Sequence, residues 1–179
     1  MTPKFLLADS DPDASLPFLV HTQAPLFFAL AIPKLSPGTH GTALSEDPRT
    51  LVRGLNLYPG FLTTPDVLPE EQLMEMIHRG AEFLLENVVG TDTRKRLCPE
   101  SVSIVWRESG TYAPKHLFAE SDQGTFVIRT QFPRLIVQLS GVRGEQIIWY
   151  ESCRERELLS ALDECRHFRS EYLGKELAT

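Results

Sequence analysis

Proline is distributed unevenly along this chain, and that distribution limits what the chain can fold into. Ten of its 13 prolines lie between Pro3 and Pro69. Proline lacks a backbone N–H and has a fixed φ, so it interrupts helices and is excluded from central strands. The prolines of this region stand at positions 3, 12, 17, 25, 33, 37, 48, 59, 65 and 69. We therefore expect residues 1–68 to form an irregular arm with short strands, and residues 69–179 to form a regular body.

Two short apolar runs inside this arm, residues 16–20 and 26–32, are bounded by proline. Runs of this length and setting are typical of buried or edge strands. Residues 34–49 contain two glycines and two prolines with little periodicity. They predict a loop of a length that is usually functional or mobile.

Two amphipathic helices are predicted, over residues 69–89 and 153–173. Pro69 suits the first turn of the first helix, and its apolar residues recur every three or four positions. Gly80 lies within that apolar stripe and indicates close approach of another backbone. Ser152 and Glu155 have the spacing of a capping box at the start of the second helix. The opposite face of that helix is charged and includes Glu164, a pattern typical of a solvated surface.

Between these helices the sequence predicts an antiparallel meander. Its five strand-like segments are residues 102–106, 115–118, 125–130, 134–139 and 146–150. The connections between them are short and polar or contain glycine, as in hairpins. No helical crossover fits between neighbours, so parallel pairing is not expected.

The chain therefore reads as a single domain, residues 1–179, of the α+β class. We expect about five to seven strands packed against the two helices, with the proline-rich arm lying over them. The sequence indicates no internal repeat. The order of elements is similar to the helix-grip arrangement, in which a curved sheet wraps a terminal helix and encloses an apolar cavity. This is a likeness of fold alone and does not imply a function.

Charge and cysteine content narrow the classes of function. The net charge is −6 and the pI about 5.4, so binding to phosphate backbones or anionic lipid has no electrostatic basis. The three cysteines, Cys98, Cys153 and Cys165, have neither disulfide-framework nor zinc-site spacing. We expect a soluble cytoplasmic protein with reduced thiols, bound to neither nucleic acid nor membrane.

The sequence contains no recognisable catalytic or metal-binding set. Asp9, Asp11 and Asp13 follow an apolar run, but the spacing does not fit a calcium loop, and an exposed acidic turn is expected. The histidines have no metal-ligand spacing. Cys98 and His116 could form a thiolate pair, but nothing in the local sequence lowers the pKa of Cys98. We expect no cofactor and no metal, and the chain leans away from being an enzyme.

Aromatic residues are dense on the meander, which mostly indicates core and otherwise a cavity lining or a contact face. Two classes of function remain. The first is a non-catalytic protein-interaction or accessory module of the cytosol, acting on a protein partner or by self-association. The alternative is a small apolar-ligand-binding protein or enzyme with a cavity between the curved sheet and the C-terminal helix. The residues expected to line that cavity are Trp106, His116, Arg129 and Trp149.

Overall fold

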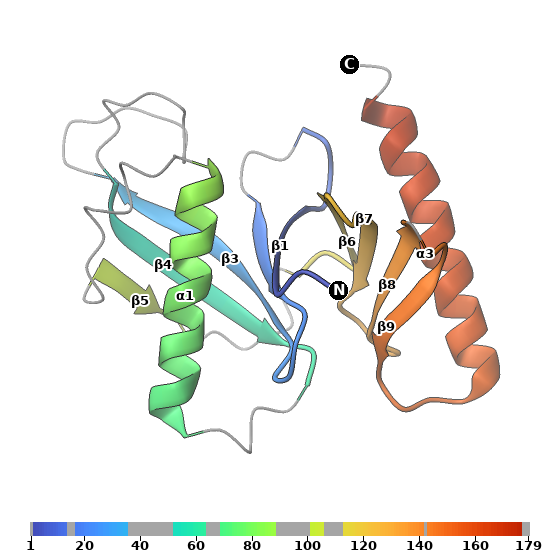
Figure 1. Cartoon of the computed structure of the whole chain (residues 1–179), viewed down its shortest axis with the longest axis horizontal. Helices are drawn as coiled ribbons and strands as arrows, with labels where there is room; N and C mark the ends of the chain where they lie inside the picture. Colours follow the sequence, from blue (N-terminus) through green and yellow to red (C-terminus); the bar gives the residue numbers. More distant parts are fainter. Residues whose placement is uncertain are drawn as a thin grey trace.

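The computed structural model describes residues 2–13, 17–35, 52–63, 69–88, 101–105, 113–141 and 143–176. These residues form one open nine-stranded sheet with two helices (Figure 1). The order of strands in the sheet is β5-β4-β3-β2-β1-β6-β7-β8-β9. The bounds are β1 Phe5–Asp9, β2 Phe18–His21, β3 Phe27–Leu35, β4 Val52–Phe61, β5 Val102–Ile104, β6 His116–Ser121, β7 Gly124–Arg129, β8 Leu135–Ser140 and β9 Gln146–Tyr150. The predicted α+β class is confirmed.

Both predicted helices form close to their expected bounds, as α1 (Glu70–Val88) and α3 (Glu155–Glu176). The Pro69 carbonyl accepts hydrogen bonds from the first turn of α1, so this proline occupies the cap, where a missing N–H costs nothing. Gly80 is packed closely as expected, although the neighbour is a side chain. A Cβ there would lie 2.5 Å from Cδ2 of Leu19.

The predicted capping box of α3 is wrong by two residues. Arg154 precedes the helix, and its backbone N–H donates a hydrogen bond of 2.8 Å to the Glu157 carboxylate. This is the same reciprocal contact that was expected from Glu155 to Ser152. The sequence favoured Ser152, because serine is a preferred N-cap residue and arginine is not, whereas the helix begins after Arg154.

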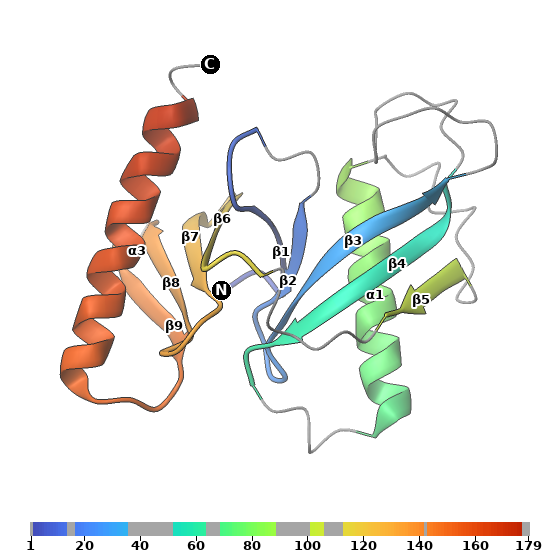
Figure 2. The ribbon, with the colours of Figure 1, turned by 180° about the vertical axis from the view of Figure 1, so that it is seen from behind.

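The two helices cover the same face of the sheet. Phe5 and Leu7 of β1 pack with the α1 cluster, and Phe118 of β6 packs with the α3 cluster. Asp9 continues the alternation of Phe5 and Leu7 and is the direct partner of Phe118. Paired residues of neighbouring strands point to the same side of a sheet. Both helices therefore lie on one face, which we call the outer face, α1 over the β3–β4 half of the sheet and α3 over the β8–β9 half (Figures 1 and 2).

The other face, the inner face, carries a core cluster drawn from strands of both halves of the sheet. It includes Leu6, Val20, Phe28, Leu117 and Phe126, all at most 6% exposed. These side chains alternate along their strands with those that face the helices. Along most strands, successive side chains therefore alternate between the core beneath the helices and the inner-face cluster.

A contact between distant strands shows that the sheet curls around this inner cluster. The Arg134 guanidinium, beside β8, donates a hydrogen bond of 3.1 Å to the carbonyl of Phe61 at the end of β4. Five strands separate β4 from β8, so a flat sheet would hold them roughly 29 Å apart at about 4.8 Å per strand. The inner face is therefore concave. α3 lies on the convex side, which differs from a helix-grip arrangement.

The prediction of an irregular arm over residues 1–68 is wrong for its described part. β1 to β4 are regular strands, β1 and β2 are central, and the sheet has nine strands where five to seven were expected. Pro33 lies in β3 beyond Leu30, where pairing with β2 ends, and Pro59 lies in β4 beyond Leu57, where pairing with β5 ends. At both places the strand lacks a described neighbour on one side, and proline is tolerated there.

The first strand of the predicted meander is also misplaced. β5 pairs with β4 in parallel, with Leu55 opposite Val102, at the far edge of the sheet from β9. α1 lies between β4 and β5 in the chain and supplies the crossover that parallel pairing requires. The exclusion of parallel neighbours was therefore wrong at this one pair, because the crossover helix precedes residue 102 and the partner strand lies in the proline-rich region.

The chain is built from two equivalent units. The first unit consists of β1 to β4 followed by α1, and the second unit consists of β6 to β9 followed by α3. In each, four antiparallel strands form a meander, and the helix then packs on the outer face of the strands before it. β5 follows the first unit and has no counterpart in the second among the described residues.

The sequence carries the same repeat, contrary to the prediction of none. Pro-Lys-Phe-Leu-Leu-Ala-Asp-Ser-Asp at residues 3–11 and Pro-Lys-His-Leu-Phe-Ala-Glu-Ser-Asp at residues 114–122 share six of nine residues. Thr-Gln-Ala-Pro at 22–25 corresponds to Thr-Gln-Phe-Pro at 130–133. The first pair of segments is 111 residues apart and the second 108. A period that changes with loop length is hard to detect in a sequence.

Equivalent residues of the two units make equivalent contacts. The Thr22 hydroxyl donates to the carbonyl of Pro3, and the Thr130 hydroxyl donates to that of Pro114. Ala8 and Ala119 correspond to each other and are also direct partners in the β1–β6 pair. A pseudo-two-fold axis therefore passes between these two alanines and relates the units.

Candidate functional site

A cluster of charged side chains lies between the sheet and α3 in the second unit. We call Lys115, His116, Arg129 and Glu164 the charged cluster. His116 and Arg129 are direct partners on β6 and β7, and both belong to the strand faces beneath α3. Glu164 reaches them from the middle of α3. Its Oε2 lies 2.7 Å from Nζ of Lys115, 3.3 Å from Nη2 of Arg129 and 3.8 Å from Nε2 of His116.

Arg129 is the most deeply buried charge of the cluster, at 6% exposed. Its Nη1 donates to the carbonyls of Gln131 and Pro133 at 2.7 and 3.0 Å, and its Nε and Nη2 both donate to Glu164 at 3.3 Å. A buried guanidinium is tolerated only when its donors are satisfied and its charge is paired. Glu164 provides that pairing, and hydrogen bonding from Lys115 lowers the pKa of its carboxyl group.

His116 is held neutral inside this cluster. Burial, with the positive charges of Lys115 and Arg129, lowers the pKa of His116 to about 4, and Glu164 opposes the shift. The ring stacks on Phe168 of α3 at 5.1 Å between centroids, and Nε2 has no hydrogen-bond partner. At neutral pH the cluster therefore holds two cations, one carboxylate and one neutral imidazole.

The first unit has the same backbone positions without this chemistry. Lys4, Phe5 and His21 correspond to Lys115, His116 and Arg129. Phe83 stacks on Phe5 at 5.6 Å as Phe168 stacks on His116, which aligns the helices and makes Arg79 the counterpart of Glu164.

These counterparts form no charged cluster. Arg79 pairs with Glu75 on the exposed side of α1. His21 is 1% exposed, lies between the rings of Phe5 and Phe27, and contacts the Pro25 carbonyl at 2.9 Å. Burial lowers its pKa. The charged cluster is therefore a property of the second unit alone.

Two pockets flank the cluster along α3. The first, the N-terminal pocket, has a volume of about 380 Å³. It is lined by Arg129, Phe132, Pro133, Arg156, Glu157, Ser160, Ala161 and Glu164. Five of these eight residues are polar or charged, and Phe132, which is 57% exposed, adds apolar surface.

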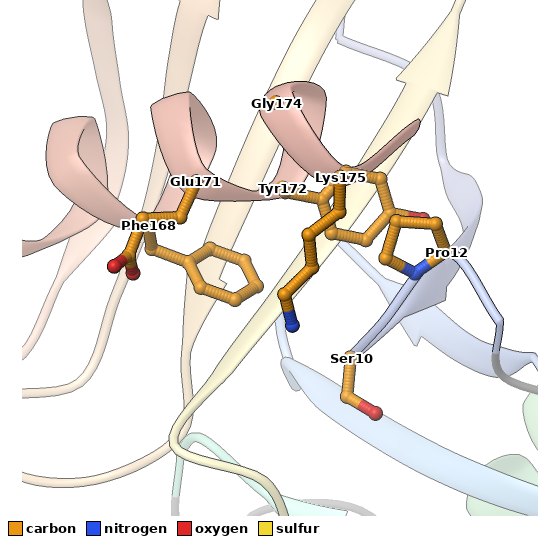
Figure 3. A pocket seen from close by; sticks show the side chains of 7 residues that line it. All are labelled: Ser10, Pro12, Phe168, Glu171, Tyr172, Gly174 and Lys175. Atoms are coloured by element: carbon orange, nitrogen blue, oxygen red, sulfur yellow. The ribbon is translucent and has the colours of Figure 1, made fainter. Parts of the chain in front are cut away.

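The second, the C-terminal pocket, lies between the end of α3 and the segment after β1, and has a volume of about 460 Å³. Its lining is Ser10, Pro12, Phe168, Glu171, Tyr172, Gly174 and Lys175. Figure 3 shows the Lys175 side chain extending into the space between Phe168 and Ser10. Nζ of Lys175 also pairs with Oδ2 of Asp11 at 2.7 Å, which ties the helix end to the β1–β2 segment.

The structure brings together two of the four predicted lining residues. His116 and Arg129 lie beneath α3, and Arg129 also lines the N-terminal pocket. Trp149 packs with the inner-face cluster, on the other side of the sheet. Trp106 and Cys98 lie outside the described residues, as does most of the loop predicted at 34–49, whose first two residues, Lys34 and Leu35, instead end β3.

Sequence reasoning missed Glu164, which it assigned to the solvated face of the helix. The signal was its spacing: Glu164 stands three residues after the buried Ala161 and four before Phe168, at the border of the apolar stripe. The acidic turn was correct in part. Asp11 is near the surface, but Asp9 is the last residue of β1, and burial raises its pKa.

The chemistry of the described residues does not single out a reaction. Among them, no group of three or more histidine, cysteine, aspartate or glutamate residues is placed to hold a metal ion. Burial raises the pKa of the Cys165 thiol to about 12, so this cysteine is no nucleophile. Within the described ranges, no helix is long and apolar enough to cross a membrane.

Comparison of the chain with protein-family models, with curated proteins and with solved structures gives no match.

Proposed function

We propose that this protein is a non-catalytic interaction module, and that it binds a protein partner through the exposed edge of its second unit. Three exposed large apolar residues lie on the two neighbouring elements of this edge: Ile147 and Tyr150 on β9, and Leu159 on α3. They are 39%, 48% and 55% exposed. We call these three residues the edge patch, and their grouping is the observation that carries the proposal.

Packing and pairing support the view that these residues form one surface. Tyr150 is opposite Leu135 and Ile147 is opposite Val137, and both partners pack beneath α3. Ile147 and Tyr150 therefore point to the outer face. Two turns after Leu159, Arg166 pairs with Glu145 just before β9 at 2.6 Å. That side of α3 therefore runs along β9 (Figure 1).

The composition of the edge patch favours a protein partner. Contiguous exposed apolar side chains on a folded protein commonly mark interaction sites, and aromatic residues are enriched at such sites. The net charge of −6 makes nucleic acid an unsuitable partner. A cytosolic setting is proposed from the cysteine pattern, with Cys153 and Cys165 unpaired.

Photocrosslinking tests this proposal. A photoreactive amino acid replaces Ile147 in the full chain, and in a control it replaces Ile32, an isoleucine of similar exposure on β3, at 36%. We expect a protein adduct of defined mass from position 147 in cells and none from position 32. Equal labelling from both positions, or no adduct from position 147, would contradict the proposal.

A second function, binding of a small apolar ligand, is favoured by the C-terminal pocket. Phe168, Tyr172 and Pro12 give this pocket an apolar wall, and Lys175 and Ser10 add polar groups at its mouth. Few convergent polar groups on an apolar lining are characteristic of ligand sites. Native mass spectrometry of the purified protein tests this alternative. A bound small molecule that is lost when Phe168 is replaced by Ala supports it, and a mass equal to that of the chain alone argues against it.

A further inference from the structure

The free edge of β9 differs from the equivalent edge in the first unit. By the register of the two meanders, β9 corresponds to the Tyr58–Phe61 end of β4. That end of β4 contains Pro59, which cannot donate a hydrogen bond to a further strand. The segment before it is covered by β5, which pairs with Leu55–Leu57. Edge strands are commonly protected by proline or by such a cover.

β9 has neither kind of protection within the described part of the chain. Its residues, Gln-Ile-Ile-Trp-Tyr, include no proline and no charged side chain. Its register against β8 shifts between Ile136 and Val137, leaving Ile148 as an extra residue on β9. This bulge is what turns both Ile147 and Tyr150 to the outer face, because residues three apart in a regular strand point to opposite faces. The bulge thus builds the edge patch.

The charges around β9 are balanced within the chain. At one end Glu145 pairs with Arg166, and at the other Glu151 pairs with Arg134, each at 2.6 Å. An antiparallel copy of the strand would therefore meet a neutral strand with an acid–base pair at each end. Like-charge repulsion, which commonly prevents edge strands from associating, is absent from these paired positions.

The chain already contains one association of this geometry. β1 and β6 are equivalent strands of the two units and pair antiparallel across the pseudo-two-fold axis at Ala8 and Ala119. This architecture therefore accommodates two copies of one unit joined edge to edge, with their helices on the same face. Within the described residues, β9 also has one edge without a neighbouring strand.

From these observations we propose that the partner of the edge patch is a second copy of this chain. β9 of each copy pairs antiparallel with β9 of the other across a true two-fold axis, and the two edge patches meet beside the new strand pair. One sheet then continues through both chains. This inference rests on the proposed function and identifies its partner.

Measurement of the mass in solution tests the dimer. Light scattering coupled to size-exclusion chromatography, over a concentration series of the full chain, should give twice the chain mass of 20.2 kDa. Ile147→Lys and Leu159→Lys should raise the dimer dissociation constant by about tenfold or more, since each places a charge in an apolar contact. Ile32→Lys and Met74→Lys are matched controls at 36% and 40% exposure, and both should remain dimeric. Circular dichroism confirms that each variant is folded.

The outcomes separate this inference from the proposed function. A wild-type chain that stays monomeric at its highest soluble concentration overturns the dimer, as does a dimer that tolerates both edge-patch substitutions. If position 147 then crosslinks to a different protein, the interaction function stands with another partner. An adduct of two copies of the chain, together with a dimer sensitive to Ile147→Lys, supports both.

Discussion

The two units share one scaffold, and their differences show where the chain has specialised. In each unit a threonine after the second strand donates a hydrogen bond to the carbonyl of the proline that precedes the first strand. In each unit a phenylalanine of the helix also stacks on the first residue of that first strand. They differ around one spot, where Phe5 and His21 of the first unit correspond to His116 and Arg129 of the second. Arg79, which is aligned with Glu164, lies on the exposed side of α1. The first unit fills that spot with aromatic rings, whereas the second fills it with charge.

The difference extends to the sheet edges. The first unit protects its outer strand with Pro59 and with β5, whereas no described residue pairs with the outer edge of β9, which lies beside exposed apolar residues. Residues that are common to both units make the same contacts in each, so their role in stabilising the fold explains why they are present. Positions that differ need a separate explanation, and they lie along α3 and β9.

The largest effect is expected at equivalent core positions. Phe18 and Phe126 occupy corresponding places on the inner face and are 7% and 0% exposed. Each substitution to Ala should lower the free energy of unfolding by about 3–5 kcal/mol. Urea denaturation measures this, with Phe132→Ala as an exposed control that changes stability by less than about 0.5 kcal/mol.

Because the inner cluster joins both units, each of these variants should unfold in a single transition. Two separate transitions, with each substitution moving only one of them, would show that the units are independent domains and that the inner cluster does not join them.

The sequence predicted the parts of the fold that depend on local pattern. α1 and α3 were found because their apolar stripes repeat every three to four residues, and β6 to β9 because short turns separate alternating segments. Pairing between distant segments could not be read this way. β5 has the composition of a meander strand, and only its contact with β4 places it at the other edge.

Proline was the most misleading signal. Pro33 and Pro59 lie inside the two longest strands, at points where one side of the strand has no described partner. Where a partner strand ends depends on the length of that partner, so the sequence around each proline does not show it. His116 and Arg129 were named from the sequence as the lining of an apolar cavity, and the charged cluster that they form with Lys115 and Glu164 was not predicted. Glu164 was missed because a carboxylate at the border of a helical stripe is solvated or buried according to what lies beneath it.

The next effect concerns pH and the imidazole of His116. Its pKa is about 4 in the folded protein and 6.5 as the ordinary value, so the unfolded chain binds more protons between these limits. Stability from this group is therefore complete above pH 6.5 and is lost as the pH falls towards 4. The loss should reach about 1–3 kcal/mol.

His116→Phe, which installs the residue found at the equivalent Phe5, should flatten this part of the stability curve. Urea unfolding at a series of pH values measures the slope, and His167→Gln, at a side chain 75% exposed, is the control. An unchanged slope in His116→Phe would mean that the pKa of His116 is the same in the folded and the unfolded protein, contrary to what its burial implies.

A smaller effect is expected from the pairing of Arg129. Glu164→Gln removes the counter-charge of a guanidinium that is 6% exposed, while the carbonyls of Gln131 and Pro133 remain as acceptors. Because the Glu164 side chain is 38% exposed, water replaces part of the interaction, and we expect a loss of about 1–2 kcal/mol. Arg79→Gln, at the equivalent position of α1, should change stability by less than about 0.5 kcal/mol. Equal losses in thermal or urea unfolding would remove the contrast between the units.

The smallest effect tests what the units share. Thr22→Val and Thr130→Val each remove a hydroxyl that donates to the carbonyl of the equivalent proline, Pro3 or Pro114, and each should lower the free energy of unfolding by about 1 kcal/mol. The two threonines belong to different units with separate partners, so the double variant should lose the sum of the single losses. Equal and additive losses in urea unfolding would show that the threonine of the repeated Thr-Gln-x-Pro segment stabilises both units by the same amount. A large loss at one threonine alone would mean that both units contain the segment but that its hydrogen bond stabilises only one of them.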